Sequence, residues 1–439
     1  MKKIISVAAV AAVAVSATFA DLKSSLNVRM GGNVVSHTRK DNSDDNRTKV
    51  MDLGSDDFGA DGLTFKLSND YAGVTLNYGA SLQAKEKEGI NQATGFWTNN
   101  GKGIELSAWL KPTDWLKFQV GAHKDGIFTA EQVKKDTDDT SWSGAGAYSF
   151  LHKPGVITQA SSGYFLDSLV DVGNGGQPYL YVDFSFADVG PGTLTFRPTF
   201  VSTGVNFLKT KDSEDSDVAM KTAPGLLAMY QVEDVVKVNV DFQMPTIHDI
   251  AFGIYGSPLG LLDGNLQLMA GFTLSTNTSD ATDNLGYTGI ARDTTFYAAD
   301  LRVCYVAGNF HIANAFNFTG ASEDKKVKQK EGTGKNTHKD AVFGNAEIWD
   351  AVFLTYKLND NWTITGNVQL DAVTGVKGET SDDATILDLY VTPGIMYTVG
   401  KGATITAGFH LRFLDLADGW GDKSGSTIIS VPFVFRVKM

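Results

Sequence analysis

The sequence contains almost no cysteine, since Cys304 is the only one among its 439 residues. A single cysteine excludes an intramolecular disulfide and, with it, the disulfide-stapled scaffolds. Basic residues are also scarce: 38 Lys and Arg stand against 50 Asp and Glu, which gives a formal net charge of -12. So acidic a chain argues against binding to nucleic acid, and we expect no nucleic-acid partner.

Long apolar runs are missing after residue 20. No later stretch approaches the ~18–20 apolar residues of a membrane-spanning helix, so any crossing of a membrane must be made by strands. The start of the chain differs. Lys2 and Lys3 precede an apolar run over residues 4–17, and small residues stand at Thr18 and Ala20. We therefore expect residues 1–20 to be a secretory signal peptide cleaved after Ala20, with no Cys behind it for lipid attachment.

Alternation of apolar and polar residues is what the sequence has in abundance. Residues 73–84 place Val74, Leu76 and Tyr78 on one face of a strand and Thr75 and Asn77 on the other. Residues 236–244 and 403–413 repeat the design. Such runs match the ~9–11 residues of a tilted membrane strand, whereas soluble strands are usually nearer ~5–6 residues. The pattern predicts an all-β chain with long strands.

The charged residues indicate what the apolar face meets. In the strands that can be drawn, Asp, Glu, Lys and Arg stay off that face, except for Asp350, which we place at the loop end of its strand. A soluble sandwich would tolerate more exceptions, whereas a Lys or Arg at the bilayer midplane costs ~2–4 kcal/mol. We therefore expect the apolar face to contact outer-membrane lipid.

Short polar links alternate with longer polar stretches along the chain. This asymmetry is typical of outer-membrane barrels, whose short turns are periplasmic. We predict a transmembrane antiparallel up-and-down β-barrel over residues 21–439, with about eighteen strands (sixteen is the alternative). The first strand is expected at 22–35 and the last at 426–439, with both termini in the periplasm. The link 245–249 is short where a loop is due. The short links are residues 69–71, 112–114, 188–192, 233–234, 256–264, 307–309, 359–361 and 400–402, and the long stretches are 37–61, 86–101, 125–177, 204–221, 277–292, 320–345, 373–383 and 415–426.

Aromatic residues flank two of the short links in the phase of the apolar face. They predict an interfacial belt, because an aromatic body with a polar edge favours headgroup depth. Trp109 and Trp115 also flank a short link, but their phase points them inward. The belt residues are Tyr305, Phe310, Tyr356 and Trp362.

The opposite face carries charges of both signs. Rings of charged side chains bias which ions enter a channel, and the basic residues are the more numerous here. We expect a basic wall facing acidic loops, with modest ion selectivity; structural ion pairs across the lumen are the alternative. The inward basic residues are Arg29, Lys66, Lys117, Arg197, Lys237, Arg302, Lys357, Arg412 and Arg436, and the acidic ones are Glu105, Asp183, Asp241, Asp300, Asp371 and Asp388.

No pattern of catalytic residues stands out. The sequence has no GxSxG, HExxH or paired-Cys motif, and its seven His are scattered. Acidic loop clusters could bind Ca²⁺, but Asn46 stands where an EF-hand requires Gly in the first of them. We expect no enzyme, no cofactor and no metal site.

The expected signal peptide, the hairpins at 106–120 and 353–370 and the alternating final strand at 426–439 resemble bacterial porins, in a style similar to that of spirochaetal outer-membrane β-barrel proteins. The resemblance implies barrel-assembly machinery as a partner, and a homotrimer. The C-terminus departs from the porin pattern, in which a terminal aromatic is read by that machinery. Here Phe433 and Phe435 precede a terminal Met439.

The stretch 125–177 is the longest predicted loop, and loops of such length are usually functional. It follows the fifth predicted strand, as the inward-folded loop of porins does. The resemblance therefore implies a constriction loop that carries Asp136, Asp138 and Asp139. An external cap or an oligomer contact is the alternative.

Barrels of this size leave an aqueous lumen, so we expect passive diffusion of ions and small hydrophilic solutes. A solute-specific channel, for sugars for instance, is the first alternative, with inward aromatics as a stacking track. A non-conducting barrel that acts as an adhesin or structural surface protein is the second. The inward aromatics are Trp109, Trp115, Tyr181, Phe353 and Tyr390.

Overall fold

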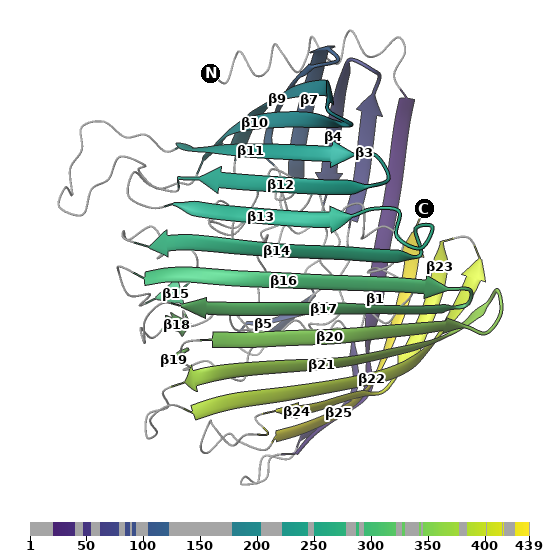
Figure 1. The fold of residues 1–439 in the computed structure, drawn as a ribbon. Helices are drawn as coiled ribbons and strands as arrows, with labels where there is room; N and C mark the ends of the chain where they lie inside the picture. The colour runs from purple at the N-terminus through teal and green to yellow at the C-terminus, as the bar shows by residue number, and fades with distance from the viewer. Residues whose placement is uncertain are drawn as a thin grey trace.

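The computed structural model describes most strands of the wall and the short turns between them (Figure 1). The expected signal peptide and the stretch 125–177 lie outside the described residues. Those described are 21–39, 47–53, 62–78, 84–87, 90–93, 104–122, 178–202, 222–244, 250–277, 287–288, 294–321, 327–329, 342–343, 346–376, 384–400, 402–414, 416 and 426–438.

One antiparallel sheet of twenty strand segments forms the wall. The last segment, β25, pairs with β1 along most of its length, which closes the wall into a barrel. Closure supplies partners for backbone groups that would otherwise lie exposed at a sheet edge. The segments are β1 (Asp21–Arg39), β2 (Arg47–Leu53), β3 (Gly62–Ser68), β4 (Ala72–Tyr78), β7 (Ile104–Thr113), β8 (Leu116–Ala122), β9 (Pro178–Val189), β10 (Gly192–Ser202), β11 (Thr222–Val232), β12 (Val236–Gln243), β13 (Ala251–Pro258), β14 (Leu266–Asn277), β16 (Thr294–Ala307), β17 (Phe310–Ala321), β20 (Ala346–Lys357), β21 (Trp362–Val376), β22 (Ala384–Gly400), β23 (Ala403–Gly408), β24 (His410–Leu414) and β25 (Ser426–Lys438).

At two places in the sheet, two short strand segments lie where one strand was expected. β2 and β3 both pair with β1, β2 along its C-terminal part and β3 along its N-terminal part. β23 and β24 both lie between β22 and β25 and are separated at Phe409, which is 57% exposed. An all-β antiparallel barrel is confirmed, whereas the exact number of membrane-crossing strands stays a prediction.

Several stretches expected to be loops contain strand. β1, expected over residues 22–35, continues to Arg39, and β2 lies inside the expected loop 37–61, where His37 Nδ1 is 2.9 Å from Thr48 Oγ1. These segments are rich in polar residues on both faces, so they lack the apolar alternation that marks a lipid-facing strand. Smaller sheets outside the wall pair β5 (Ala84–Lys87) with β6 (Ile90–Ala93), and β18 (Val327–Gln329) with β15 (Tyr287–Thr288) and β19 (Val342–Phe343).

The short turns gather at one end of the barrel (Figure 1). Asparagine side chains build two of them. Asn69 Oδ1 accepts hydrogen bonds from the backbone N–H groups of Tyr71 and Ala72 at 2.9 and 2.8 Å. Asn359 Oδ1 does the same for Asn361 and Trp362, both at 3.0 Å. An Asx turn of this kind satisfies backbone donors where the chain reverses, which explains why so few residues suffice.

The two faces of the wall differ sharply, and β21 shows it most clearly. Trp362, Ile364 and Val368 point outward and are 41%, 42% and 48% exposed. Their neighbours Thr365 and Asn367 point inward and are 1% and 4% exposed. Inward side chains are covered because the concave side of a closed sheet crowds them together. The polar face is therefore the covered one, which reverses the usual order of a soluble protein.

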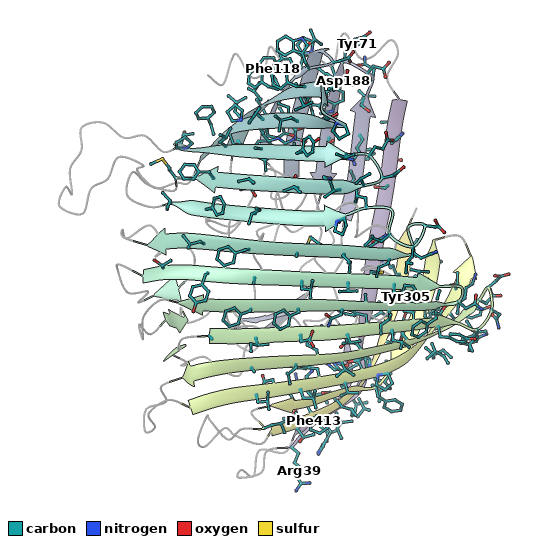
Figure 2. The ribbon with its side chains drawn as sticks, in the orientation of Figure 1. Arg39, Tyr71, Phe118, Asp188, Tyr305 and Phe413 are labelled. Carbon is teal, nitrogen blue, oxygen red and sulfur yellow. The ribbon has the colours of Figure 1, made fainter. Side chains whose placement is uncertain are left out.

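Apolar outward side chains recur on most strands of the barrel (Figure 2). Exposed apolar surface on this scale marks a face that meets something other than water. Among the described residues, helices with the length and hydropathy of a membrane span are absent. The outward apolar side chains include Phe65, Leu106, Leu110, Phe118, Val120, Leu180, Phe186, Phe196, Phe200, Leu226, Phe242, Ile254, Phe272, Leu301, Ile348, Ile395, Ile405 and Ile429.

Candidate functional site

Charged side chains of alternating sign form a row across the inward face from β8 to β12. Strand register brings them into line: Lys117 lies opposite Asp183, Arg197 opposite Leu227, and Leu227 opposite Asp241. The row takes one inward residue from each of five consecutive strands, because side chains on one face repeat every second residue. Four of the five are charged, and Leu227 is the apolar member on β11; we call these five residues the charged row.

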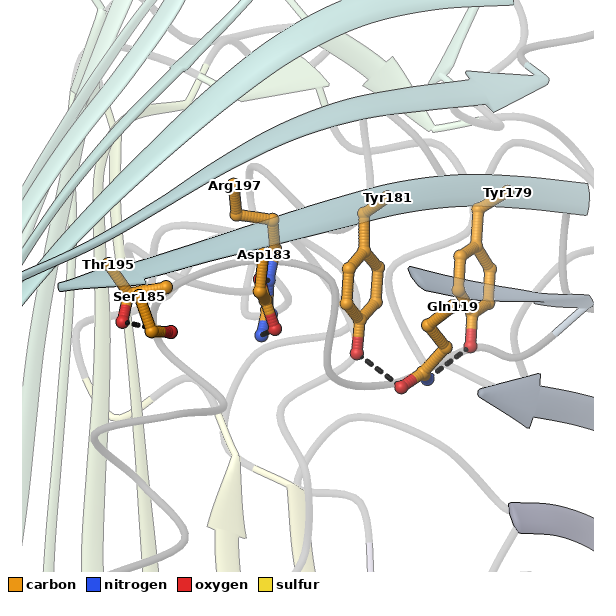
Figure 3. A network of polar contacts seen from close by, with 7 residues as sticks. All are labelled: Gln119, Tyr179, Tyr181, Asp183, Ser185, Thr195 and Arg197. Atoms are coloured by element: carbon orange, nitrogen blue, oxygen red, sulfur yellow. Dashed lines mark hydrogen bonds and ion pairs between the residues drawn. The ribbon is translucent and has the colours of Figure 1, made fainter. Parts of the chain in front are cut away.

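Arg197 and Asp183 form the ion pair at the centre of the charged row (Figure 3). Arg197 Nε donates to Asp183 Oδ1 at 2.5 Å, and Arg197 Nη2 donates to Asp183 Oδ2 at 2.9 Å. The two side chains are only 5% and 10% exposed. A planar guanidinium that binds both carboxylate oxygens is held in one orientation, so this pair is a fixed feature of the wall.

Aromatic rings lie beside both cations of the charged row, Arg197 and Lys117. The guanidinium carbon of Arg197 lies 4.0 Å from the ring centroid of Tyr181. Lys117 Nζ lies 5.9 Å from the same ring and 5.5 Å from that of Trp109. Cations over aromatic faces gain electrostatic stabilisation from the ring quadrupole. Trp109 reaches this position because its register partner is Gly73, where a Cβ would lie 2.3 Å from Trp109 Nε1.

Gln119 holds the tyrosines of this wall in place. Its Nε2 donates to the Tyr179 hydroxyl at 2.9 Å, and its Oε1 accepts a hydrogen bond from the Tyr181 hydroxyl. The two rings stack with centroids 5.8 Å apart and planes 8° apart. Figure 3 shows both rings pointing the same way from β9, with Gln119 joining their tips. The charged row is therefore continued by a rigid polar and aromatic surface.

A second polar surface lies on the inward face of β21 to β25. The Tyr390 hydroxyl donates to Asp388 Oδ2 at 3.2 Å, and the Tyr390 ring lies 6.3 Å from that of His410. Gln369 is the register partner of Tyr390 and is fully buried. Amides and hydroxyls prevail here, in contrast to the charged row on β8 to β12.

Small and apolar inward residues separate the two polar surfaces. Cys304, Ala313, Ala351 and Phe353 form a buried cluster on β16, β17 and β20. Cys304 Sγ lies 3.1 Å from His311 Nε2. Groups of His, Cys, Asp and Glu that could hold a metal ion are absent from the part of the chain that the structure describes. A small apolar cluster therefore lies on the inward face with the polar residues His311 and Thr355 among its described neighbours.

The inward residues expected to line a pore fall into three groups. Those whose side chains are described and lie in the inward phase of the wall strands are Lys117, Arg197, Lys237, Arg412, Arg436, Asp183, Asp241 and Asp388. Lys66 and Lys357 are exposed, and Lys357 Nζ pairs with Asp360 Oδ1 of its own turn at 3.1 Å. The third group has its backbone in the wall, but its side chains are not among those described. It consists of Arg29, Glu105, Arg302, Asp300 and Asp371.

The outward aromatics near the short turns lie where the alternation placed them. Tyr305, Tyr356 and Trp362 are 37%, 43% and 41% exposed, and Phe310 is half-buried. Figure 2 shows Tyr305 near the end of the wall that carries the short turns. Trp362 also packs on Tyr397, with ring centroids 4.7 Å apart, which the sequence reading missed because Tyr397 lies on the next strand. Their role as a belt stays a prediction.

One expected placement is wrong. Trp115, expected inward, is 50% exposed and stacks on Phe184, an outward residue, at a centroid distance of 6.5 Å. It lies in a turn, where the two-residue alternation no longer fixes direction. Asp350, the acidic exception on the apolar face, accepts a hydrogen bond from Asn314 Nδ2 at 2.6 Å. A hydrogen-bonded carboxylate on this face costs less than a bare one.

The proposed constriction residues Asp136, Asp138 and Asp139 lie outside the described residues. What the structure does describe is a closed antiparallel wall with an apolar outward face and a polar, charged inward face. These features define the class of the chain: it is a transmembrane β-barrel of the bacterial outer-membrane type.

Solved structures similar to this chain include other outer-membrane barrels. OccAB3 of Acinetobacter baumannii is 11% identical, with 95% of this chain and 100% of that chain covered and a TM-score of 0.47. The outer membrane protein opdK of Pseudomonas aeruginosa is 12% identical, with 95% and 98% covered and a TM-score of 0.47. OmpT, an outer membrane protein of Vibrio cholerae, is 10% identical, with 95% and 97% covered and a TM-score of 0.40. No family model and no curated protein matches the chain.

Proposed function

We propose that the chain is an outer-membrane porin that allows passive diffusion of ions and small hydrophilic solutes. The observation that carries this proposal is the covered polar face: charged and hydrogen-bonding side chains point into a barrel whose outer side chains are apolar. A barrel that served only as an anchor could fill its interior with apolar side chains. Placing Arg197, Asp183, Lys237 and Asp241 there is favourable only if the interior is polar or wet.

The charged row bears on the ion selectivity of the proposed channel. Positive and negative side chains alternate across neighbouring strands, and the Arg197–Asp183 pair cancels much of its own charge. Lys117 Nζ lies beside the rings of Trp109 and Tyr181. We therefore propose modest selectivity, which the basic side chains tilt toward anions. The stretch 125–177, with Asp136, Asp138 and Asp139, is proposed to supply the acidic side of a constriction opposite this wall.

The remaining expectations stay part of the proposal. We propose export with cleavage after Ala20, insertion by the barrel-assembly machinery and assembly as a homotrimer. We propose transport without catalysis, cofactor or metal. Mass spectrometry of the protein isolated from membranes would test the cleavage directly, because it gives the mass of the mature chain.

Liposome swelling tests the porin proposal. Vesicles that contain the refolded barrel should swell in isotonic solutions of small polar solutes, and the rate should fall as solute size rises. Vesicles prepared with the same detergent but without protein are the control. If protein-containing vesicles swell no faster than the control with the smallest solutes, the barrel is not a diffusion channel.

A further inference from the structure

Uncharged polar side chains form a patch on the inward face of β21, β22 and β25. Thr365, Asn367 and Gln369 follow one another at every second position of β21 and are 1%, 4% and 0% exposed. Thr392 lies opposite Asn367 on β22, and Ser430 lies on β25; each is 1% exposed. We call these five residues the neutral patch. At ~3.3 Å per residue, it extends about 13 Å along β21.

The hydrogen-bonding groups of the neutral patch lack partners within the described part of the chain. This holds for the hydroxyls of Thr365, Thr392 and Ser430, for Asn367 Nδ2, and for both Nε2 and Oε1 of Gln369. Buried polar groups are almost always hydrogen-bonded, because an unmade bond in a covered site costs free energy. So many donors and acceptors on neighbouring strands indicate that something polar enters and binds them.

The surroundings of the patch indicate the chemistry of that ligand. Phe353 is the register partner of Asn367, and Tyr390 is that of Gln369, so an aromatic side chain flanks the patch on each side. Both are nearly fully buried, at 7% and 2% exposed. The charged residues Asp388 and Arg412 lie at the Tyr390 end. The titratable His410 on β24 lies opposite Ser430. The five residues of the patch themselves carry no charge, in contrast to the charged row.

We propose that the neutral patch is a binding site for a neutral polyhydroxylated solute, such as a short oligosaccharide. Hydroxyl groups both donate and accept, as the amides and hydroxyls of the patch require. The apolar C–H faces of a sugar ring suit flanking aromatic side chains. Inorganic ions lack this combination. The inference deepens the proposed porin function by naming a solute class, but binding to the patch does not require conduction.

Binding of maltotriose by the full refolded barrel, measured by titration calorimetry in detergent, tests the site. We expect saturable binding by the wild type. The double variant Asn367→Leu with Gln369→Leu should bind at least about tenfold more weakly, since the three unpartnered amide atoms of these side chains are lost. Gln231→Leu is the matched control: Gln231 is exposed on β11, outside the patch, and its replacement should leave the affinity unchanged. If the double variant does not fold, Thr365→Val with Thr392→Val replaces it and should weaken binding severalfold.

The outcomes separate this site from the channel. Conduction without saturable maltotriose binding, or equal binding by wild type and patch variants, overturns the site and leaves the porin proposal standing. Maltotriose binding that the patch variants weaken, in a barrel that does not conduct, supports the site and removes the porin proposal. Binding together with saturable block of the current supports both.

Discussion

Arg197 on β10 and Asp183 on β9 form a two-point ion pair on the inward face of the barrel, at 2.5 and 2.9 Å. The pair is almost fully covered, and the Tyr181 ring lies against the guanidinium. A covered charge pair on the concave side of a membrane barrel is costly to break, because either partner alone would be a buried charge. A substitution of either partner should therefore change both the free energy of unfolding of the barrel and the charge of its inward face.

Removing one member of this pair should destabilise the barrel. Asp183→Leu is expected to lower the free energy of unfolding by roughly 3–5 kcal/mol, since it removes the carboxylate that pairs with the buried guanidinium of Arg197. Asp183→Leu combined with Arg197→Met should recover most of the loss, because no unpaired charge then remains. Urea unfolding of the refolded barrel in detergent measures both. If Asp183→Leu were as stable as the wild type, water in the interior would have to solvate Arg197 fully.

Reversing one inward charge should change ion selectivity. Lys117→Glu places a carboxylate beside Asp183, so the reversal potential in a KCl gradient should shift by several millivolts toward cation preference. Lys111→Glu is the matched control, because Lys111 lies close to a short turn and pairs there with Asp114 at 3.1 Å. Equal shifts for the two variants would show that Lys117 does not border the ion path.

Charge on the outward face should cost stability according to depth. Leu301 lies near the middle of β16 and is 44% exposed, so Leu301→Arg should cost ~2–4 kcal/mol. Tyr305→Arg, four residues nearer the short turn, should cost only ~0–1 kcal/mol, because Arg reaches the headgroups there. Folding titrations into lipid vesicles measure the difference. Equal costs at both positions would contradict a lipid-facing surface with Tyr305 near its rim.

Adjacent residues of β21 should differ in their access to lipid. In a Cys304→Ser background, Ile364→Cys should react with a lipid-soluble thiol reagent when the barrel is in vesicles, because position 364 is 42% exposed on the outward face. Thr365→Cys should react far more weakly, because the inward position 365 is only 1% exposed. Labelling of position 365 alone would reverse the assignment of the two faces.

Alternation predicted the faces of β21 because inward polar residues alternate with outward apolar or small residues over residues 362–372. The same rule failed at Trp115, where a turn ends the alternation, and at β2, where both faces carry polar residues. Strand closure between β1 and β25 agrees with the expected first and last strands, although β1 is longer than predicted.

The contacts within the site were harder to predict. Asp183 and Arg197 were both expected to point inward, but their pairing depends on the register between β9 and β10, which alternation leaves open. Gln119 was missed because a single polar residue in an inward phase gives no sign that it joins two tyrosines across neighbouring strands. The neutral patch was missed for a similar reason: Thr, Asn and Gln at alternate positions resemble any polar face until their burial is known.

Single-channel recording in planar lipid bilayers tests the central claim most directly. Refolded barrel, shown to be β-sheet by circular dichroism, should give stepwise current increases as single molecules or assemblies insert, and the steps should grow with salt concentration. A barrel that inserts into the bilayer, as shown by protection from added protease, and yet gives no steps above the protein-free baseline would contradict the porin account.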